Sequence, residues 1–356
     1  MMKKQNSKIF TILALIVLGI LVYLAQSYLD AYKLRILNLS AIYITLGVSL
    51  NLIYGFTGQF SLGHAGFMAI GAYVTALLVL PPYYKEMIFI IEPLAWPFSV
   101  MHTPFIIALF FSGLITAIAA LLIGLPVLRL KGDYLGIATL GFAEIIRIVA
   151  NNIPHITNGA LGIKGIPEFT NLWWTMGVAV FTIYIIKGLI NSSYGRALMA
   201  IRENEIAAEV VGINLTYHKV MSFTIGGFFA GVGGGLFACL LTTIDPKAFM
   251  FLMTFNILIV VVLGGFGSIT GTVIAAFLFN IFLEYLRPIE AGFNIGPIEI
   301  PGIPGLRMVT FAALLLIVIL YKQKGLLGGV EFSWEGFFQF FSRLFSNKNS
   351  SEGSAT

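Results

Sequence analysis

The chain has 356 residues, of which 58% are hydrophobic and only 10% are charged, and its mean hydropathy is +0.93. Soluble domains carry about 25% charged residues, so this composition excludes a soluble globular protein and predicts an all-α polytopic membrane protein. The net charge of +5 is modest and forms no basic patch with interleaved aromatic residues, which argues against nucleic-acid binding. The single cysteine, Cys239, excludes an intramolecular disulfide and a cysteine metal site.

Ten stretches of the chain are apolar enough to cross a bilayer, which takes about 20 mostly apolar residues. The first follows Lys3, Lys4 and Lys8 and resembles a signal peptide. Because the next apolar stretch follows almost at once, we interpret it as an uncleaved helix with its N-terminus in the cytoplasm. The expected spans are residues 9–29, 36–54, 60–80, 104–126, 134–153, 172–190, 217–241, 249–264, 267–286 and 306–321.

The distribution of basic residues supports this topology. With the N-terminus inside, 13 of the 21 Lys and Arg residues fall on inner segments, seven fall on outer segments, and Arg147 lies within a span. An excess of basic residues in cytoplasmic loops is the usual pattern, so both termini are predicted to be cytoplasmic. The tail, residues 330–356, ends in a Ser- and Asn-rich stretch that we expect to be partly disordered.

The start of the third span is unusually polar for a membrane segment. Within residues 51–73, Gln59, Ser61 and His64 lie among five glycines. Broken backbone and polar side chains are tolerated at membrane depth only where they face protein or water, so these residues are candidates to line a polar path. The alternative is that His64 is a satisfied packing residue. A weaker echo at residues 264–271 leaves an internal repeat open.

The fifth span carries two opposite charges. Glu144 and Arg147 are three residues apart and therefore share one face of a helix. Ionisable residues within a span are costly, face the bundle interior and are candidates for function, although an ion pair that only fixes packing explains them equally well. The chain contains no P-loop, HExxH motif or nucleophile elbow. We therefore predict no catalytic residue, no metal site and no hydrolysis of ATP by this chain.

A polar segment, residues 192–214, separates the sixth and seventh spans. Five charges fall between Arg196 and Glu209, and Gly212 is a plausible C-terminal stop. We predict one short amphipathic helix over residues 196–212, either lying on the lipid surface or docking a soluble partner. The apolar residues that recur at helical spacing are Leu198, Ile201, Ala208 and Val211.

Several segments, in order, resemble one family. The run at residues 51–73 resembles the signature of permeases from bacterial branched-chain amino acid ATP-binding cassette importers. Further matches to the LivM branch extend the resemblance over most of the chain, from about residue 51 to residue 328. They are LRLKGDYLGIATLGFAEIIRIVANN, TNGALGIKGI, GRALMAIRENEIAAEVVGIN and GLRMVTFAALLLIVILYKQKGLLG.

This resemblance implies a permease domain over residues 1–329 that forms the path for branched-chain amino acids across the bacterial plasma (inner) membrane. It implies a LivH-type permease partner, two cytoplasmic ATP-binding cassette subunits that bind the ATP, and an extracytoplasmic substrate-binding protein. The chain itself would be a transport subunit without a cofactor rather than an enzyme. A urea or amide importer of the same superfamily and a stand-alone, ion-coupled secondary transporter are the alternatives.

Residues 205–212 resemble the E-A-A-x-x-x-G coupling motif of importer permeases, with Ile206 as an inserted residue. The resemblance implies that ATP-driven closure of the ATPases pulls on this helix and switches the bundle between outward- and inward-facing states. Ala207 and Ala208 would let the helix sit close in a groove of the ATPase, and Gly212 would allow the turn out. The full set of expected coupling residues is Arg196, Arg202, Glu205, Ala207, Ala208 and Gly212. The residues expected near the path are Gln59, Ser61, His64, Glu144 and Arg147.

Overall fold

The computed structural model describes residues 2–90, 92–287, 290, 293–295, 298–300, 303, 305–322, 325–327, 331–332 and 334. A helix overlaps every stretch that we expected to span the membrane. The first five are α1 (Met2–Tyr28), α2 (Ala31–Asn51), α3 (His64–Val79), α5 (Phe105–Val127) and α6 (Asp133–Asn152). The others are α8 (Leu172–Ile190), α11 (Leu215–Leu241), α12 (Phe251–Gly264), α13 (Ile269–Tyr285) and α15 (Leu306–Tyr321).

Among the described residues, five helices are long and apolar enough to cross a membrane, namely α1, α2, α5, α8 and α11. A sixth span results if α3 and α4 (Pro82–Ile88), which are bent by 119°, are counted together. The protein is thus an all-α polytopic membrane protein. The ten crossings, the cytoplasmic termini and the division at residue 329 stay predictions. Apart from residues 331, 332 and 334, the expected tail lies outside the described residues.

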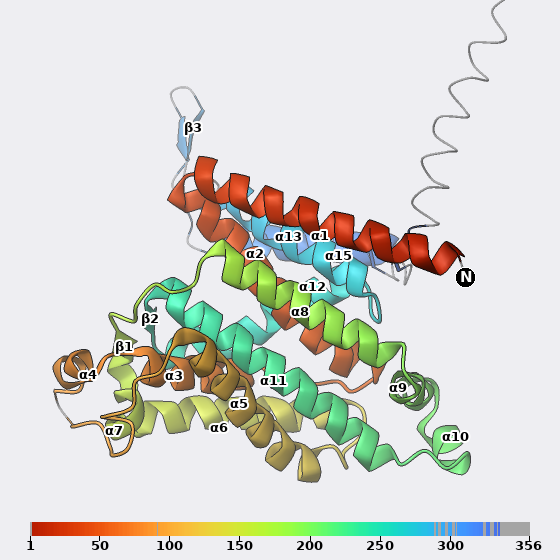
Figure 1. Ribbon diagram of the computed structural model, residues 1–356, viewed down its shortest axis with the longest axis horizontal. Coiled ribbons are helices and arrows are strands. Elements are labelled where there is room, and N and C mark those ends of the chain that lie inside the picture. Colours follow the sequence, from red (N-terminus) through yellow and green to blue (C-terminus); the bar gives the residue numbers. More distant parts are fainter. Residues whose placement is uncertain are drawn as a thin grey trace, which may run out of the picture.

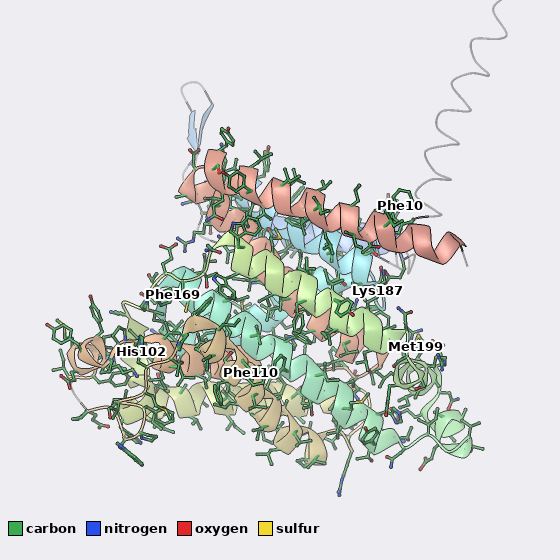
Figure 2. All side chains as sticks on the ribbon, in the orientation of Figure 1. Phe10, His102, Phe110, Phe169, Lys187 and Met199 are labelled. Atoms are coloured by element: carbon green, nitrogen blue, oxygen red, sulfur yellow. The ribbon has the colours of Figure 1, made fainter. Side chains whose placement is uncertain are left out.

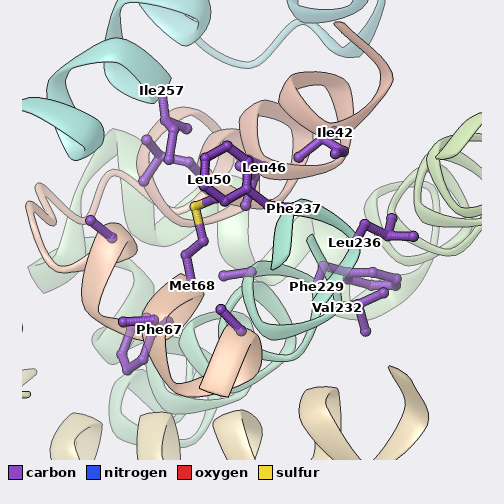
Figure 3. Packing of buried hydrophobic residues seen from close by; sticks show 14 of the residues in the cluster. Ile42, Leu46, Leu50, Phe67, Met68, Phe229, Val232, Leu236, Phe237 and Ile257 are labelled. Carbon is purple, nitrogen blue, oxygen red and sulfur yellow. The ribbon is translucent and has the colours of Figure 1, made fainter. Parts of the chain in front are cut away.

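The centre of the bundle is α11, which packs against α2, α3 and α5 (Figure 1). The close approach depends on glycine, because a Cβ atom at Gly71 or Gly234 would collide with the backbone of the facing helix. Small residues are favoured at such contacts in lipid, where apolar burial gives no drive for helices to associate. Larger side chains such as Met68 and Phe237 fill the remaining space around α11 (Figure 3).

Burial differs sharply between the first two helices. The span of α2 is 83% buried, and the span of α1 is only 6% buried. A helix that is apolar on all sides and surrounded by protein belongs to a core, whereas an exposed apolar helix needs lipid around it. The bundle is therefore built around α2 and α11, with α1 along its edge (Figure 1).

The connecting segments gather at two opposite ends of the molecule (Figure 1). One end, here the α4 end, holds α4, α7 (Pro154–Thr157) and the short ribbon of β1 (Ile163–Lys164) and β2 (Thr243–Ile244). The other, here the α9 end, holds α9 (Ser193–Glu203), α10 (Glu205–Val210) and the N-terminus of α1. His102 lies toward the α4 end and Met199 toward the α9 end (Figure 2). A second ribbon joins β3 (Phe293–Ile295) and β4 (Ile298–Ile300).

The predicted topology places the N-terminus and residues 192–214 on one side of the membrane, and the structure confirms that both lie at the α9 end. The described residues of the C-terminal tail reach the same end. There the indole Nε1 of Trp334 donates to the hydroxyl of Thr11 across 3.1 Å. The compartment that this end faces stays a prediction.

Candidate functional site: the coupling segment and the glycine-rich turns

The polar segment contains two helices, so our prediction of a single helix over residues 196–212 is wrong. The chain leaves helical geometry at Asn204, whose φ and ψ are −161° and 111°. The Asn204 side-chain oxygen then accepts a hydrogen bond from the backbone N–H of Ala207 at 3.0 Å and caps α10. Asparagine is a preferred N-cap residue because it satisfies a backbone donor that has no partner within the helix. The segment therefore folds as α9, a break, and α10.

The two short helices have one buried face and one exposed face. Leu198, Ile201 and Ala208 are buried as the helical spacing predicts. Ala207, next to Ala208, is exposed, so only Ala207 is available to a partner. Gly212, with a φ of +87°, follows α10 and is exposed at the turn toward α11.

Three apolar side chains project from α10 and the residue after it. Ile206 is 71% exposed, Val210 is 82% exposed and Val211 is 74% exposed. We name these residues the α10 patch. The exposure of Val211 contradicts its predicted place on the buried face, because α10 ends at Val210 and the helical spacing does not continue. Arg196, on α9, is also exposed.

Glu205 binds to the body of the bundle. Its carboxylate pairs with the Nζ of Lys219 at 2.5 Å and lies 3.8 Å from the Nζ of Lys131. The Lys219 side chain is only 8% exposed and belongs to the first turns of α11. Truncating one member of a buried pair leaves the other charge uncompensated, so this contact fixes α10 on α11. The sequence analysis did not single out Lys219. The feature that could have indicated its role is a lone cation at the start of an apolar span.

Arg202 binds to the bundle as well. Its Nη1 donates to the backbone carbonyl of Gly55 at 2.9 Å, and its Nη2 pairs with Glu203 at 2.6 Å. A Cβ atom at Gly58 would lie 3.0 Å from the Arg202 side chain, and one at Gly267 would lie 2.9 Å from its Nη1. Both glycines have positive φ, +74° and +76°, which other residues rarely adopt. Arg202 therefore rests on two glycine-dependent turns.

These two turns also contact each other. The first contains a π-helical turn, Leu52–Phe56, and the second joins α12 to α13. The side-chain amide of Asn51 donates to the Ser268 carbonyl at 2.9 Å, and its oxygen accepts from the Gly267 N–H at 2.9 Å. The rings of Tyr54 and Phe266 stack with their centroids 4.8 Å apart. The weak sequence echo at residues 264–271 thus lies against residues 51–58, although an internal repeat stays unproven.

The three polar residues expected near a path are deeply buried. Gln59, Ser61 and His64 are 2%, 1% and 0% exposed. His64 shares a hydrogen bond with Ser49 through Nε2 at 2.9 Å, but its Nδ1 has no partner within the described part of the chain. Neither atom of the Gln59 amide has a partner there. Buried polar groups without partners are rare. Gln59 and His64 are therefore not packing residues whose hydrogen bonds are all satisfied within the described chain.

The predicted pairing of Glu144 and Arg147 is confirmed, with Nε and Oε2 2.7 Å apart. Their side chains are 34% and 27% exposed in this chain, so they do not face only the bundle interior. Their helix, α6, also holds residues 59–64, because the Thr139 hydroxyl accepts from the backbone N–H of Leu62 at 2.9 Å. The structure thus places residues 59–64 beside α6, which carries the ion pair, and joins Arg202 to the turn just before those residues.

The fold is that of a polytopic helical membrane protein with buried polar groups inside its bundle, as expected where a solute crosses a membrane. The model of the family described as branched-chain amino acid transport system / permease component matches residues 32–320. The chain belongs to this family, whose members are membrane permease subunits of ATP-binding cassette importers.

Curated relatives agree with this assignment. The high-affinity branched-chain amino acid transport system permease proteins LivM of Salmonella typhimurium and Escherichia coli are each 34% identical over 326 residues, which covers 82% of this chain and 69% of each relative. The probable LivM of Methanocaldococcus jannaschii is 25% identical over 314 residues, 80% of this chain and 90% of that protein. No solved structure matches the chain.

Proposed function

We propose that this chain forms half of the translocation path of an importer for branched-chain amino acids in the bacterial plasma membrane. Its partners would be a LivH-type permease, two cytoplasmic ATP-binding cassette subunits and an extracytoplasmic binding protein that delivers the solute. The observation that carries the proposal is the α10 patch, an exposed apolar surface on a segment that is tied to the bundle at Glu205 and Arg202.

The α10 patch supports docking of an ATPase at the α9 end. Exposed apolar side chains that cluster on a surface mark a site of interaction with protein or membrane. The patch lies beyond the first turn of α11, at the extremity of the molecule (Figure 1). A cytoplasmic subunit that covers it would push on a segment whose inner face holds Ala208, Leu198 and Ile201.

The contacts of Arg202 support a route from the docking surface to the transmembrane helices. A displacement of α9 would act on the Gly55 carbonyl directly and on the Gly267 turn, where a Cβ atom would lie only 2.9 Å from the Arg202 Nη1. Those turns end α2 and α12 and begin α13. Rigid helices that meet at flexible glycine turns are suited to a switch between two packed arrangements.

The Glu144–Arg147 pair supports a path at the surface of α6. Charged side chains at membrane depth pair with one another and face protein or a water-filled cavity. Because each is about a third exposed in this chain, the uncovered side needs a second protein surface or water. A LivH-type subunit against α6 would enclose the pair between the two permeases.

The proposal is tested by changing Ile206 and Val210 to Asp in the complete importer reconstituted in liposomes. Because two buried carboxylates would oppose docking, ATP-dependent uptake of leucine should fall at least about tenfold while the protein still inserts. Val100→Asp, an exposed position at the α4 end, is the matched control. Unchanged uptake in the double variant would contradict docking through α10, and uptake of urea instead of leucine would assign the chain to the urea and amide importers.

A further inference from the structure

A polar cavity lies toward the α4 end, far from residues 192–214. It has a volume of about 480 Å³ and lies where the end of α1, the start of α2, residues 168–172 and the end of α11 meet. Its apolar wall includes Leu34, Leu172, Leu240 and Leu241. Its polar wall includes Arg35, Asn38 and Glu168, which come from α2 and from the segment that precedes α8.

Three polar groups of this cavity are free to bind a ligand, whereas the hydroxyls of Tyr32 and Thr170 and the side-chain oxygen of Asn171 are already hydrogen-bonded. Asn38 is only 6% exposed, and its side-chain oxygen accepts from the Thr175 hydroxyl at 2.7 Å. This bond leaves the Asn38 NH₂ group without a partner among the described residues. Within the same part of the chain, the guanidinium of Arg35 and the carboxylate of Glu168 form no ion pair. The amide donor of buried Asn38, the exposed cation of Arg35 and the exposed anion of Glu168 therefore line one cavity, and each can bind a ligand.

This arrangement selects for a particular chemistry. A carboxylate pairs well with a guanidinium and with an amide donor, and an ammonium group pairs with a carboxylate. The leucine side chains supply an apolar surface on which an aliphatic side chain can pack. A small zwitterion with an aliphatic side chain can bind the cation and amide donor, the carboxylate and the leucine wall at the same time.

We propose that this cavity is a receiving site for a hydrophobic α-amino acid, with its carboxylate at Arg35 and Asn38, its ammonium group at Glu168 and its side chain on the leucines. The site deepens the proposed function and rests on it. Leu240 and Leu241 end α11, the same helix whose first turns hold Glu205 through Lys219. A helix of 27 residues is about 40 Å long, so one rigid element joins the receiving site to the coupling segment.

The same chemistry could come from the headgroup of an ethanolamine phospholipid, because α1 beside the cavity is exposed along most of its length. The test therefore uses the full-length chain in nanodiscs made only of phosphatidylcholine and measures saturable binding of tritiated leucine. Leucinamide, which lacks the carboxylate, and 4-methylpentanoate, which lacks the ammonium group, should compete poorly. Adding phosphatidylethanolamine should leave leucine binding unchanged.

Two variants remove the charges one at a time. Because each change removes a hydrogen bond to a charged group, Arg35→Gln and Glu168→Gln should each weaken leucine binding about tenfold or more. Lys33→Gln and Glu86→Gln remove exposed charges at the same end that do not line the cavity, and they should keep the wild-type affinity.

Three results would overturn the site: no saturable leucine binding, equal affinity in all four variants, or loss of leucine binding when phosphatidylethanolamine is added. ATP-driven leucine uptake by the complete importer separates this inference from the proposed function. If the wild-type importer takes up leucine but leucine binding does not depend on Arg35 and Glu168, only the receiving site is contradicted. If the importer takes up no leucine while binding depends on both residues, the site stands and the importer assignment fails.

Discussion

Arg202 joins residues 192–214 to the bundle through a backbone atom. Its guanidinium donates to the Gly55 carbonyl, and the backbone at Gly58 and Gly267 approaches it closely. A planar group with several donors suits such a position better than a lysine, whose ammonium is compact and strongly hydrated. The contact thus depends on the shape of one side chain and on two positions that tolerate no Cβ without strain.

We expect Arg202→Gln to uncouple the importer. The shorter, neutral side chain cannot keep the charge-assisted bond to Gly55, so ATP hydrolysis should continue while leucine uptake falls severalfold or more. The measurement compares both rates in liposomes. Lys187→Gln, an exposed position at the end of α8, should behave as wild type. Equal losses of ATPase activity and uptake would indicate a folding defect rather than uncoupling.

Lys85 is a buried cation at the α4 end. It is 1% exposed, and its Nζ donates to the carbonyls of Phe98, at 2.7 Å, and of Met101. None of the described carboxylates pairs with it. Burial lowers the pKa of Lys85 from 10.5 to about 8. The loop between α4 and α5 is therefore held by a buried cation, and burying this charge costs part of the free energy of folding.

This shift predicts a pH dependence of stability. Between about pH 8 and pH 10.5 the unfolded chain binds more protons at Lys85 than the folded chain, so the free energy of unfolding should rise with pH in that window and be flat below it. Lys85→Met should remove this slope and, by leaving two carbonyls without a donor, lower stability by about 1–3 kcal/mol. Thermal unfolding across the window checks both, with Lys247→Met as the exposed control. An unchanged slope in Lys85→Met would assign the dependence to another group.

At the scale of elements, the start of α13 is held by a residue beyond the family match. The carboxylate of Glu331 accepts from the backbone N–H of Ile269 at 2.5 Å and from the Thr270 hydroxyl at 2.7 Å. Ser268 caps the same helix by accepting from the Gly271 N–H at 3.0 Å. A negative charge at a helix N-terminus is favourable because the first N–H groups have no partner within the helix.

Glu331→Gln should loosen the first turn of α13 without unfolding the bundle. The loss of the charge at the helix start should cost about 0.3–1 kcal/mol, visible as faster hydrogen exchange at Ile269 and Thr270. Peptides from α11, far from the cap, serve as the internal standard. Glu86→Gln, an exposed carboxylate on α4, is the matched variant. Unchanged exchange in the first turn of α13 would mean that Ser268 alone holds it.

At the scale of the whole molecule, the helix positions could be predicted from the sequence. Each apolar stretch is long, and charged or turn-forming residues separate it from the next one. The Glu144–Arg147 pair was also predictable, since spacing within one helix determines it. Its partial exposure was not, because exposure depends on which helices pack beside α6. The break at Asn204 had a local signal, an N-cap residue followed by Glu and Ala, that the longer amphipathic pattern obscured.

Long-range contacts could not be predicted. Arg202 binds a carbonyl 147 residues away in sequence, and the side chain of Asn51 reaches the turn before α13 across 217 residues. Nothing in the local pattern of either residue specifies such partners. The contrast between exposed Ala207 and buried Ala208 has the same origin, because it depends on how α10 docks against α11.

The near-complete exposure of α1 has a practical consequence for handling the protein. The described protein buries only 6% of the span of α1 but 83% of the span of α2, so the surrounding medium contacts most of α1. Extraction into detergent therefore replaces the surroundings of α1 and leaves those of α2 intact. Spectroscopic probes on α2 should report the same environment in micelles and in bilayers. Probes on α1 should report different environments in detergent and in lipid.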